Sequence, residues 1–365
     1  MMSGIYVVTA LALSVTYLLW SSLQRFGPFV RSGPNQVFIA DVGAFKAIHR
    51  IGGGFTKAEY YHYFGPTEAG SPPYGLFQMT DPRDHARRRK LLGTGFTATS
   101  LRREWEAMVR KKAAAAVEGM RGEASAAAGG EVDVRKWWGL MASDVVSTIM
   151  FGKSFDSIKA GRIDPWFNEI KIANVAAFGA LSFPWLYQVL KRLPAIARSR
   201  YFHAHKALME KGEAAVMNSR QGTAAGSANV FAKVLREADA DEGGTLTGAD
   251  ISVEAGSFMI AGTDTTSNTL TYLVWAVLRQ STLRRALEQE LRENVEEKDP
   301  SRITDAALEK LPVLHAVIEE TLRLYGAAPM PLPRIVPPGG VELGGIISPG
   351  VPRWRRRRTR CIGIR

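Results

Sequence analysis

The chain has 365 residues, of which 46% are apolar and 22% charged, so it can bury a large core and is not intrinsically disordered. Its single cysteine, Cys361, excludes a disulfide framework and any metal site with several cysteine ligands. The net charge of +12 comes from 47 basic and 35 acidic residues, but seven arginines lie in the last fifteen residues, which hold no acidic residue. Without these seven, 40 basic residues remain against 35 acidic ones, a net charge of only +5. No recognition module for DNA or RNA accompanies the arginines, so we expect no nucleic-acid partner.

Residues 1–24 carry no charged side chain and are almost continuously apolar from Ile5 to Trp20. As a helix this segment would be roughly 36 Å long, enough to cross a hydrocarbon core of about 30 Å. A cleaved signal peptide is the alternative, but the basic region that normally begins one is missing. The sequence therefore predicts an uncleaved transmembrane anchor. Arg25 and Arg31 follow it, which places the rest of the chain in the cytosol by the positive-inside rule.

The first elements after this anchor are two short strands, Phe29–Arg31 and Val37–Ile39, around a turn rich in Gly, Pro and Asn. Asp41 is placed to cap a short helix behind them. From about residue 80 the pattern becomes mostly helical. Pro82 begins a run that continues to Leu92, and two glycines end it.

Further helices are predicted over 101–113, 137–151 and 313–325. The last of these begins after Pro312 and ends at Gly326, and proline and glycine are the residues expected at a helix start and a helix end. Pro331–Val336 then reads as a strand entered through a rigid turn. No linker divides residues 25–350 into two domains.

A long helix is predicted from about residue 250 to 278. Between Glu254 and Arg279 its only charged residue is Asp264, which predicts burial on nearly every side. Its many threonines and serines make a second membrane span unfavourable. Its centre, Ala261–Ser267, is composed of poor helix formers. That indicates either a local opening of the helix for function, or close packing at the glycine with threonines bonded to carbonyls one turn earlier.

Four features follow one another along the chain: the apolar first segment, the Ala-Gly-Thr-Asp-Thr-Thr centre of the long helix, Glu320-x-x-Arg323 and Pro331-Leu332-Pro333-Arg334. Together with the runs FGPFVRSGPN (26–35), DPRDH (81–85) and MFGKSF (150–155), they resemble the cytochromes P450, the haem-thiolate monooxygenases. The likeness is closest to membrane-bound fungal enzymes and extends from Phe26 to about Gly350.

The resemblance implies roles for two pairs of residues. Asp264 and Thr265 match the acid and alcohol that deliver protons to dioxygen at the haem, and a hydroxyl beside a helix groove can hold a relay water. Glu320 and Arg323 match the structural ion pair that helps to hold the haem-binding core together. If that pair is buried, breaking it on one side would cost about 3–5 kcal/mol.

Three basic residues match positions that bind the haem propionates in this family: His85, Arg89 and Arg334. Charge-assisted hydrogen bonds to such carboxylates contribute about 1.5–3 kcal/mol each. His85 and Arg89 are four apart and share one helical face. For Arg89 the alternative is a solvated basic face, because Arg87, Arg88 and Lys90 adjoin it.

The sequence departs from the family pattern near residue 350, before the haem-binding loop and the final helix. Cys361 is the candidate metal ligand, with Trp354 at the aromatic position and Gly363 as the trailing glycine. However, Arg357 and Thr359 occupy the family's glycine and arginine positions. A thiolate ligand needs a loop whose amides point at the sulfur, and an arginine run does not predict one.

The expected fold is therefore the mainly α cytochrome P450 fold with a small β-sheet region, incomplete at its C-terminal end. It would comprise a transmembrane anchor (1–24), a P450 domain without its haem loop (25–350) and an Arg-rich tail (351–365). The tail has two readings, a lipid-binding patch or the product of a shifted reading frame or retained intron.

The implied function is haem-dependent oxidation, by hydroxylation or desaturation, of a hydrophobic small molecule such as a fungal secondary metabolite. The implied partners are an NADPH-dependent P450 reductase and a membrane, which is the endoplasmic reticulum with the main domain in the cytosol. Two alternatives stay open: a catalytically inactive, truncated relative, and a membrane-bound interaction protein whose Arg tail contacts lipid headgroups.

Overall fold

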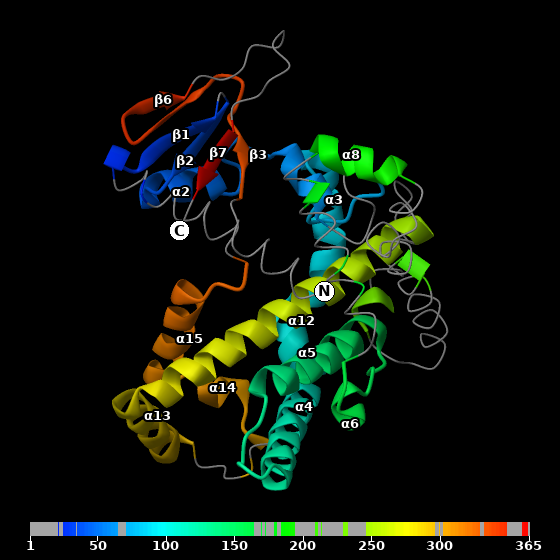
Figure 1. Ribbon diagram of the computed structural model, residues 1–365, viewed down its shortest axis with the longest axis vertical. Helices are drawn as coiled ribbons and strands as arrows, with labels where there is room; N and C mark the ends of the chain where they lie inside the picture. The colour runs from blue at the N-terminus through cyan, green and yellow to red at the C-terminus, as the bar shows by residue number, and fades with distance from the viewer. Residues whose placement is uncertain are drawn as a thin grey trace. The chain divides into compact units, whose positions relative to one another are not determined.

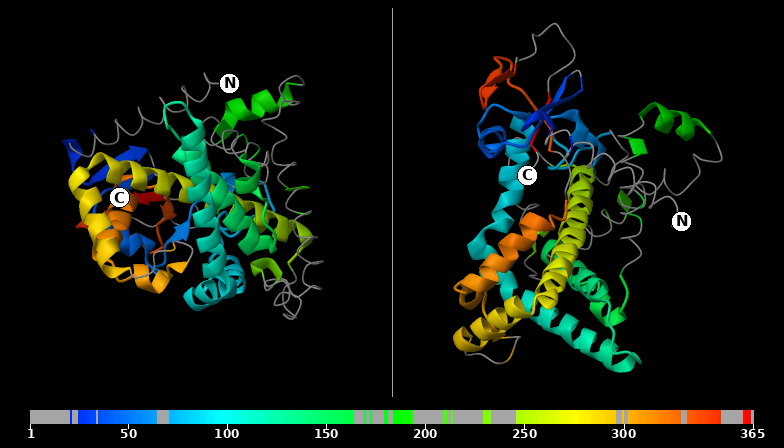
Figure 2. Two further views of the ribbon diagram at one scale, coloured as in Figure 1. Left: turned by 90° about the horizontal axis from the view of Figure 1, so that it is seen from below. Right: turned by 60° about the vertical axis from the view of Figure 1, so that its left-hand side comes forward.

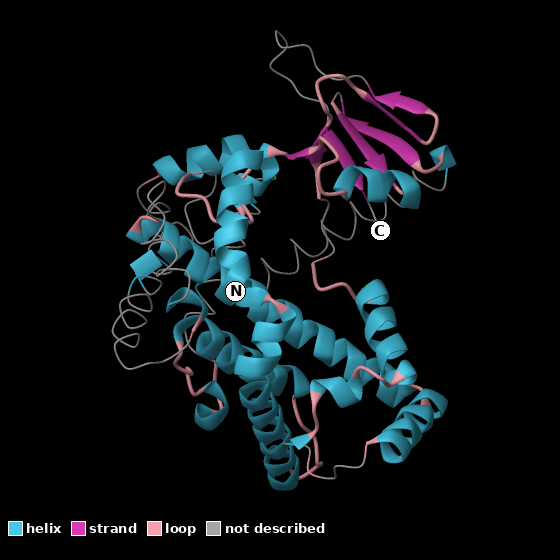
Figure 3. Ribbon diagram, turned by 180° about the vertical axis from the view of Figure 1, so that it is seen from behind, coloured by secondary structure: helices cyan, strands magenta, loops and turns pink. Residues whose placement is uncertain are grey.

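The computed structural model shows a mainly helical protein with two small sheets (Figures 1 and 3). Contacts divide it into two compact units, residues 1–61, 80–82 and 330–365 in the first and residues 62–79 and 83–329 in the second. The units alternate along the chain, which is why no linker marks the division. The structure describes residues 25–33, 35–64, 71–163, 184–193, 229–232, 246–295, 302–328, 332–348 and 360–363, with residues 21, 169, 172, 179–180, 209–210, 213 and 299.

The first unit is built on a five-stranded sheet of order β1-β2-β7-β4-β3. β1 (Phe29–Gly33) and β2 (Gln36–Ile39) pair antiparallel, as the sequence predicts. β7 (Arg360–Gly363) lies parallel to β2 and antiparallel to β4 (Arg334–Ile335). β4 in turn pairs with β3 (Thr56–Lys57). The sheet thus joins segments from both ends of the sequence.

One face of this sheet is covered by α2 (Val42–His49). The Asp41 carboxylate accepts a hydrogen bond from the Ala44 amide at 2.7 Å, so the predicted N-cap is confirmed. The buried contacts between helix and sheet come from one small apolar cluster: Ile39, Ala44, Ile48, Val336 and Leu343. A second, two-stranded sheet pairs β5 (Val341–Leu343) with β6 (Ile346–Ser348), and a 3₁₀ turn occupies Glu59–Tyr63.

The second unit contains the long helices. They are α3 (Pro82–Gly93, assigned to this unit from Arg83 on), α4 (Ala98–Ala126), α5 (Val134–Phe151), α6 (Ser157–Ala160), α8 (Pro184–Arg192), α12 (Gly248–Arg279), α13 (Ser281–Asn294), α14 (Asp305–Leu308) and α15 (Pro312–Leu324), with a 3₁₀ turn at Thr94–Phe96. The helices predicted between residues 42 and 325 are all present. α4 continues well beyond its predicted end, where residues 113–116 are four consecutive alanines, the best helix former.

A buried carboxylate links the helices at one end of this unit. Asp144 on α5 is fully buried and accepts hydrogen bonds from the Ser157 amide at 2.7 Å and the Lys112 ammonium at 3.2 Å. Ser157 begins α6 and Lys112 belongs to α4. Because a buried carboxylate is costly unless it is paired, these bonds fix the three helices together.

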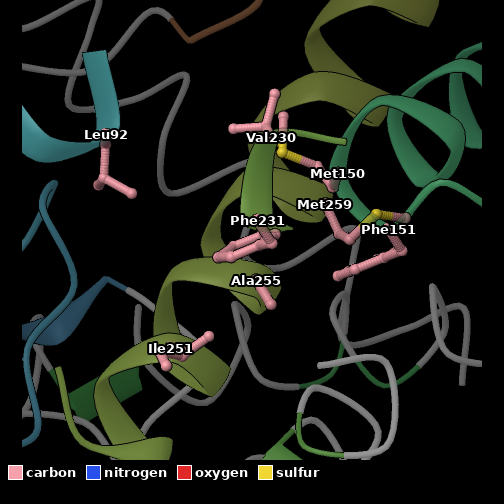
Figure 4. Packing of buried hydrophobic residues seen from close by; sticks show 8 residues of the cluster. All are labelled: Leu92, Met150, Phe151, Val230, Phe231, Ile251, Ala255 and Met259. Carbon is pink, nitrogen blue, oxygen red and sulfur yellow. The ribbon is translucent and has the colours of Figure 1, made fainter. Parts of the chain in front are cut away.

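α12 runs through the unit with α5 packed along it (Figures 1 and 2). It begins with a capping box in which Thr247 and Asp250 satisfy each other's backbone amides. The first half packs into the largest apolar cluster, which Figure 4 shows in detail: Leu92, Met150, Phe151, Val230, Phe231, Ile251, Ala255 and Met259.

The second half of α12 is not buried on every side. Tyr272, Trp275 and Leu278 are exposed. The predicted all-round burial is wrong here, because a lack of charged residues does not distinguish a buried face from an apolar face on the surface.

No helix within the described ranges is both long enough and apolar enough to span a membrane. The anchor predicted for residues 1–24 lies outside the described residues except for Ser21, so it stays a prediction.

Candidate functional site

The centre of α12 is an unbroken helix. The Thr265 hydroxyl donates to the Ala261 carbonyl oxygen at 2.6 Å, and Thr269 does the same to the Thr265 carbonyl at 2.9 Å. Of the two explanations for this threonine-rich centre, back-bonding one turn earlier is therefore what the structure shows. Thr265 itself is exposed, and Asp264 beside it is half-buried. Within the part of the chain that the structure describes, the Asp264 carboxylate has no ion-pair partner.

Gly262 and Thr263 lie where α12 packs into the unit. A Cβ at Gly262 would collide with the Val146 side chain of α5, so only glycine lets the two helices approach this closely. Thr263 is buried, and its hydroxyl has no partner among the described residues. This glycine therefore allows α12 to pack on α5 while Asp264 and Thr265 stay at the surface of the helix.

A group of aromatic rings follows the Asp264–Thr265 pair along α12. Residues 261, 265, 272 and 279 fall on one side of a helix with 3.6 residues per turn. On this side the Tyr272 ring stacks on Tyr325, which follows α15, with ring centroids 4.9 Å apart. The Arg279 guanidinium lies 4.7 Å above the Trp275 ring. The structure thus brings the end of α15 onto the second half of α12.

Glu320 and Arg323 form the ion pair that their spacing allows. The Arg323 side chain donates to both Glu320 carboxylate oxygens, at 2.7 and 2.6 Å. Hydrogen bonds from Arg323 lower the pKa of Glu320 below its ordinary value. The side chains are 55% and 65% exposed, so the cost expected for a buried pair does not apply.

α3 presents its basic residues in two different ways. His85 is half-buried, whereas Arg89 is exposed and has no ion-pair partner within the described residues. Arg88, by contrast, reaches across to α12, where it donates to Glu254 at 2.9 Å and to Asp250 at 3.0 Å. The structure therefore brings α3 onto the first half of α12, and the face of α3 that meets α12 includes Arg88.

Glu254 was not among the predicted site residues. It is only 1% exposed and also accepts a hydrogen bond from the Leu76 amide at 2.8 Å. Burial, partly offset by Arg88, raises the pKa of Glu254 to about 7. The available signal was an acidic residue near the start of a mostly apolar helical run, a position where a buried carboxylate needs a specific partner.

Arg334 lies in the first unit, in β4. Its guanidinium donates to the Tyr61 hydroxyl and to the Pro333 carbonyl at 3.3 Å, and it lies 5.2 Å from the Tyr61 ring centroid. Tyr61 is buried, and that burial raises its pKa although Arg334 opposes the shift. Tyr61, which the sequence did not single out, therefore holds Arg334 in place.

Cys361 is the residue opposite Arg334 in the sheet. It stands within β7, with Val37 as its partner on β2 and Arg334 as its partner on β4. The backbone at Cys361 therefore forms an interior strand of the sheet. Most of the Arg-rich tail that precedes it lies outside the described residues.

Comparison with known proteins identifies the family. The family model for cytochrome P450 matches residues 18–350. The chain belongs to the cytochrome P450 family. It is 36% identical over 339 residues to the cytochrome P450 monooxygenase cypX of Dothistroma septosporum. Similar matches are aflV of Aspergillus parasiticus, 37% identical over 340 residues, and stcB of Emericella nidulans, 36% identical over 352 residues, both also named cytochrome P450 monooxygenases.

These alignments cover 91–93% of this chain but only 64% of each relative. The chain therefore spans less than two thirds of the length of these P450 relatives. The expected family and mainly helical fold are confirmed, and haem is the cofactor that the family implies.

The described residues of this P450 fit a haem in part. The two haem carboxylates need cationic partners, and both the exposed Arg89 and the half-buried Arg334 have the chemistry to supply them. The thiolate side does not fit equally well. A sulfur ligand is normally surrounded by amides of a loop, whereas Cys361 stands in a strand paired on both sides. Its role as a metal ligand stays a prediction.

Proposed function

We propose that this P450 is a haem-dependent monooxygenase that oxidises a hydrophobic small molecule in fungal secondary metabolism. One oxygen atom of O₂ would enter the substrate, and the other would leave as water with two protons and two reductase-supplied electrons. The three fungal relatives named as monooxygenases support this proposal. The observation that carries it is the exposed Thr265 hydroxyl next to the half-buried Asp264 carboxylate, at the centre of an intact α12.

In this proposal Thr265 holds a water molecule and Asp264 supplies that water with protons. The Thr265 hydroxyl gives its hydrogen to the Ala261 carbonyl, so its lone pairs are free to accept a hydrogen bond from water. The adjacent Asp264 carboxylate, with no described ion partner, can take up a proton from solvent and release it to that water. Haem, when bound, supplies the activation of dioxygen.

His85, Arg89 and Arg334 would hold the haem carboxylates. Arg334 is already constrained, since Tyr61 and a backbone carbonyl orient its guanidinium. A pre-oriented cation loses little side-chain entropy on binding. We further propose that the chain works at the endoplasmic reticulum membrane, held by residues 1–24, with an NADPH-dependent reductase as its electron source.

The direct test is the spectrum of the purified full chain. We expect it to retain haem and, when reduced in carbon monoxide, to give the Soret band of thiolate ligation. Purified protein that contains no haem after expression with excess haem precursor would contradict the proposal.

A second candidate function is an inactive relative that does not retain haem. The position of Cys361 in β7 favours it, because the backbone there is paired with two neighbouring strands, whereas a thiolate ligand needs loop amides directed at the sulfur. Purified protein without bound haem would favour this second candidate. The variant Cys361→Ser separates the two, since only the enzyme would lose a thiolate band.

A further inference from the structure

One buried carboxylate connects three segments of the second unit. Glu254 on α12 accepts hydrogen bonds from the Arg88 guanidinium of α3 at 2.9 Å and from the Leu76 amide at 2.8 Å. A Cβ on Gly75, next to Leu76, would come within 3.0 Å of Val253 and Ser257, so this loop lies directly on α12. Glu254 therefore ties α3 and the loop at residues 75–79 to the same turn of α12.

Asp250 completes a fork around Arg88. One guanidinium nitrogen bonds Glu254 and the other bonds Asp250, one turn earlier on α12, at 3.0 Å. Asp250 is itself fixed, because it accepts hydrogen bonds from the Thr247 amide and hydroxyl in the capping box. A planar guanidinium held by two carboxylates at fixed positions has little rotational freedom.

Holding Arg88 fixes the rotation of α3 about its own axis. Successive residues of an α-helix are turned by about 100°. His85 therefore projects about 60° from Arg88, and Arg89 projects about 100° from it, both toward the same side. Any rotation of α3 would move the two side chains together and turn them away from a fixed ligand.

We propose that Glu254 is a positioning residue that sets the orientation of α3, and with it the direction in which His85 and Arg89 project. This inference rests on the proposed function, in which those two side chains hold haem carboxylates. A role in orientation also explains why a buried charge is kept here, since such pairs are weak contributors to stability compared with apolar packing.

Hydrogen exchange of the full chain tests this role. Glu254→Leu removes the acceptor but keeps an apolar volume, whereas Glu254→Gln keeps an oxygen that can accept from Leu76 and Arg88. We expect Glu254→Leu to raise amide exchange in residues 83–93 and 75–79 roughly tenfold or more, the size expected when a buried charged hydrogen bond is lost. Glu254→Gln should restore most of that protection.

The matched control is Glu118→Leu, because Glu118 pairs with Arg121 on the exposed surface of α4. It should leave exchange unchanged. Unchanged exchange of α3 in Glu254→Leu would overturn the proposal. So would faster exchange spread equally over α4, α5 and α13, which indicates general destabilisation, or a failure of Glu254→Gln to restore protection.

Titration of the same proteins with haemin supplies the second measurement. We expect Glu254→Leu to weaken binding several-fold, Glu254→Gln to recover it and Glu118→Leu to match the unchanged chain. Equal haemin affinity in all four proteins would overturn the link to His85 and Arg89. If the unchanged chain binds no haemin, the proposed function fails, whereas the exchange measurement still decides whether Glu254 orients α3.

Discussion

The two halves of α12 have similar composition but different surroundings. After Glu254, the only charged residues of α12 are Asp264 and Arg279, the last residue of the helix. In the first half, residues 251–256 and Met259 are buried, and Ile251, Ala255 and Met259 belong to the main apolar cluster. In the second half, Tyr272, Trp275 and Leu278 are exposed. The first half is thus held by packing, whereas the second half keeps an apolar face on the surface.

This difference shows how one helix can serve two purposes. Packing of the first half fixes the helix in the second unit, and Gly262 keeps it close to α5 at its centre. The second half can then present Asp264, Thr265 and aromatic rings from a rigid support. A contiguous exposed apolar face usually marks a surface that binds something.

The two halves should differ most in how much the free energy of unfolding falls when one apolar side chain in each is truncated to alanine. Met259 is 0% exposed and Leu278 is 59% exposed. Met259→Ala should lower the free energy of unfolding of the second unit by about 2–5 kcal/mol, because it leaves a cavity. Leu278→Ala should change it by no more than about 0.5 kcal/mol. Denaturant unfolding followed by tryptophan fluorescence measures both, and similar losses in the two variants would refute the contrast.

A smaller effect concerns the pH dependence of stability in the buried half. Folding raises the pKa of Glu254 to about 7. The folded protein therefore binds a proton on the Glu254 carboxylate more tightly than the unfolded chain does. The resulting contribution to the free energy of unfolding is fully present when the pH is below the ordinary pKa of about 4.5. It is lost as the pH rises through about 7. Between pH 5 and pH 8 the loss should be roughly 1–3 kcal/mol, and Glu254→Gln should remove it.

Thermal unfolding across this pH range gives the measurement. The groups that face Glu254 are Arg88 from α3, Asp250 from α12 and the backbone amide of Leu76. An identical pH profile in the unchanged chain and in Glu254→Gln would show that another group titrates. Glu118→Leu again serves as the surface control.

A smaller loss of stability is expected when one aromatic contact of the exposed half is removed. Tyr272→Ala removes the parallel stack on Tyr325, which is worth about 0.5–1.5 kcal/mol, while little buried area is lost. Tyr272→Phe keeps the ring and should change stability by less than about 0.5 kcal/mol. If Tyr272→Ala costs as much as Met259→Ala, then the second half of α12 is a packed core element like the first.

Sequence reasoning succeeded where the signal is local. Pro82 and Pro312 mark helix starts, and Asp41 is a cap read from its immediate neighbours. The order of the motifs was enough to identify the family, which the family model confirms. Such features depend on a few consecutive residues, so they can be predicted without knowledge of the rest of the fold.

The missed contacts join residues far apart in the sequence. Arg88 and Glu254 are separated by 166 residues, and no periodicity links them. In the sequence Arg88 stood out only as a neighbour of Arg89, within a basic run for which a solvated face was the alternative to haem binding. The strand at Cys361 was missed for a similar reason, since its partners Val37 and Arg334 come from distant segments.

The parallel pairing of β2 with β7 has a consequence for how the protein is made. β2 ends at Ile39 and β7 begins at Arg360, so at about 5–20 residues per second a ribosome needs roughly 16–64 s to pass from one to the other. Until then one edge of β2 lacks its neighbour and is open to pairing with another chain. The newly made amino-terminal hairpin is therefore exposed to pairing with another chain throughout this interval.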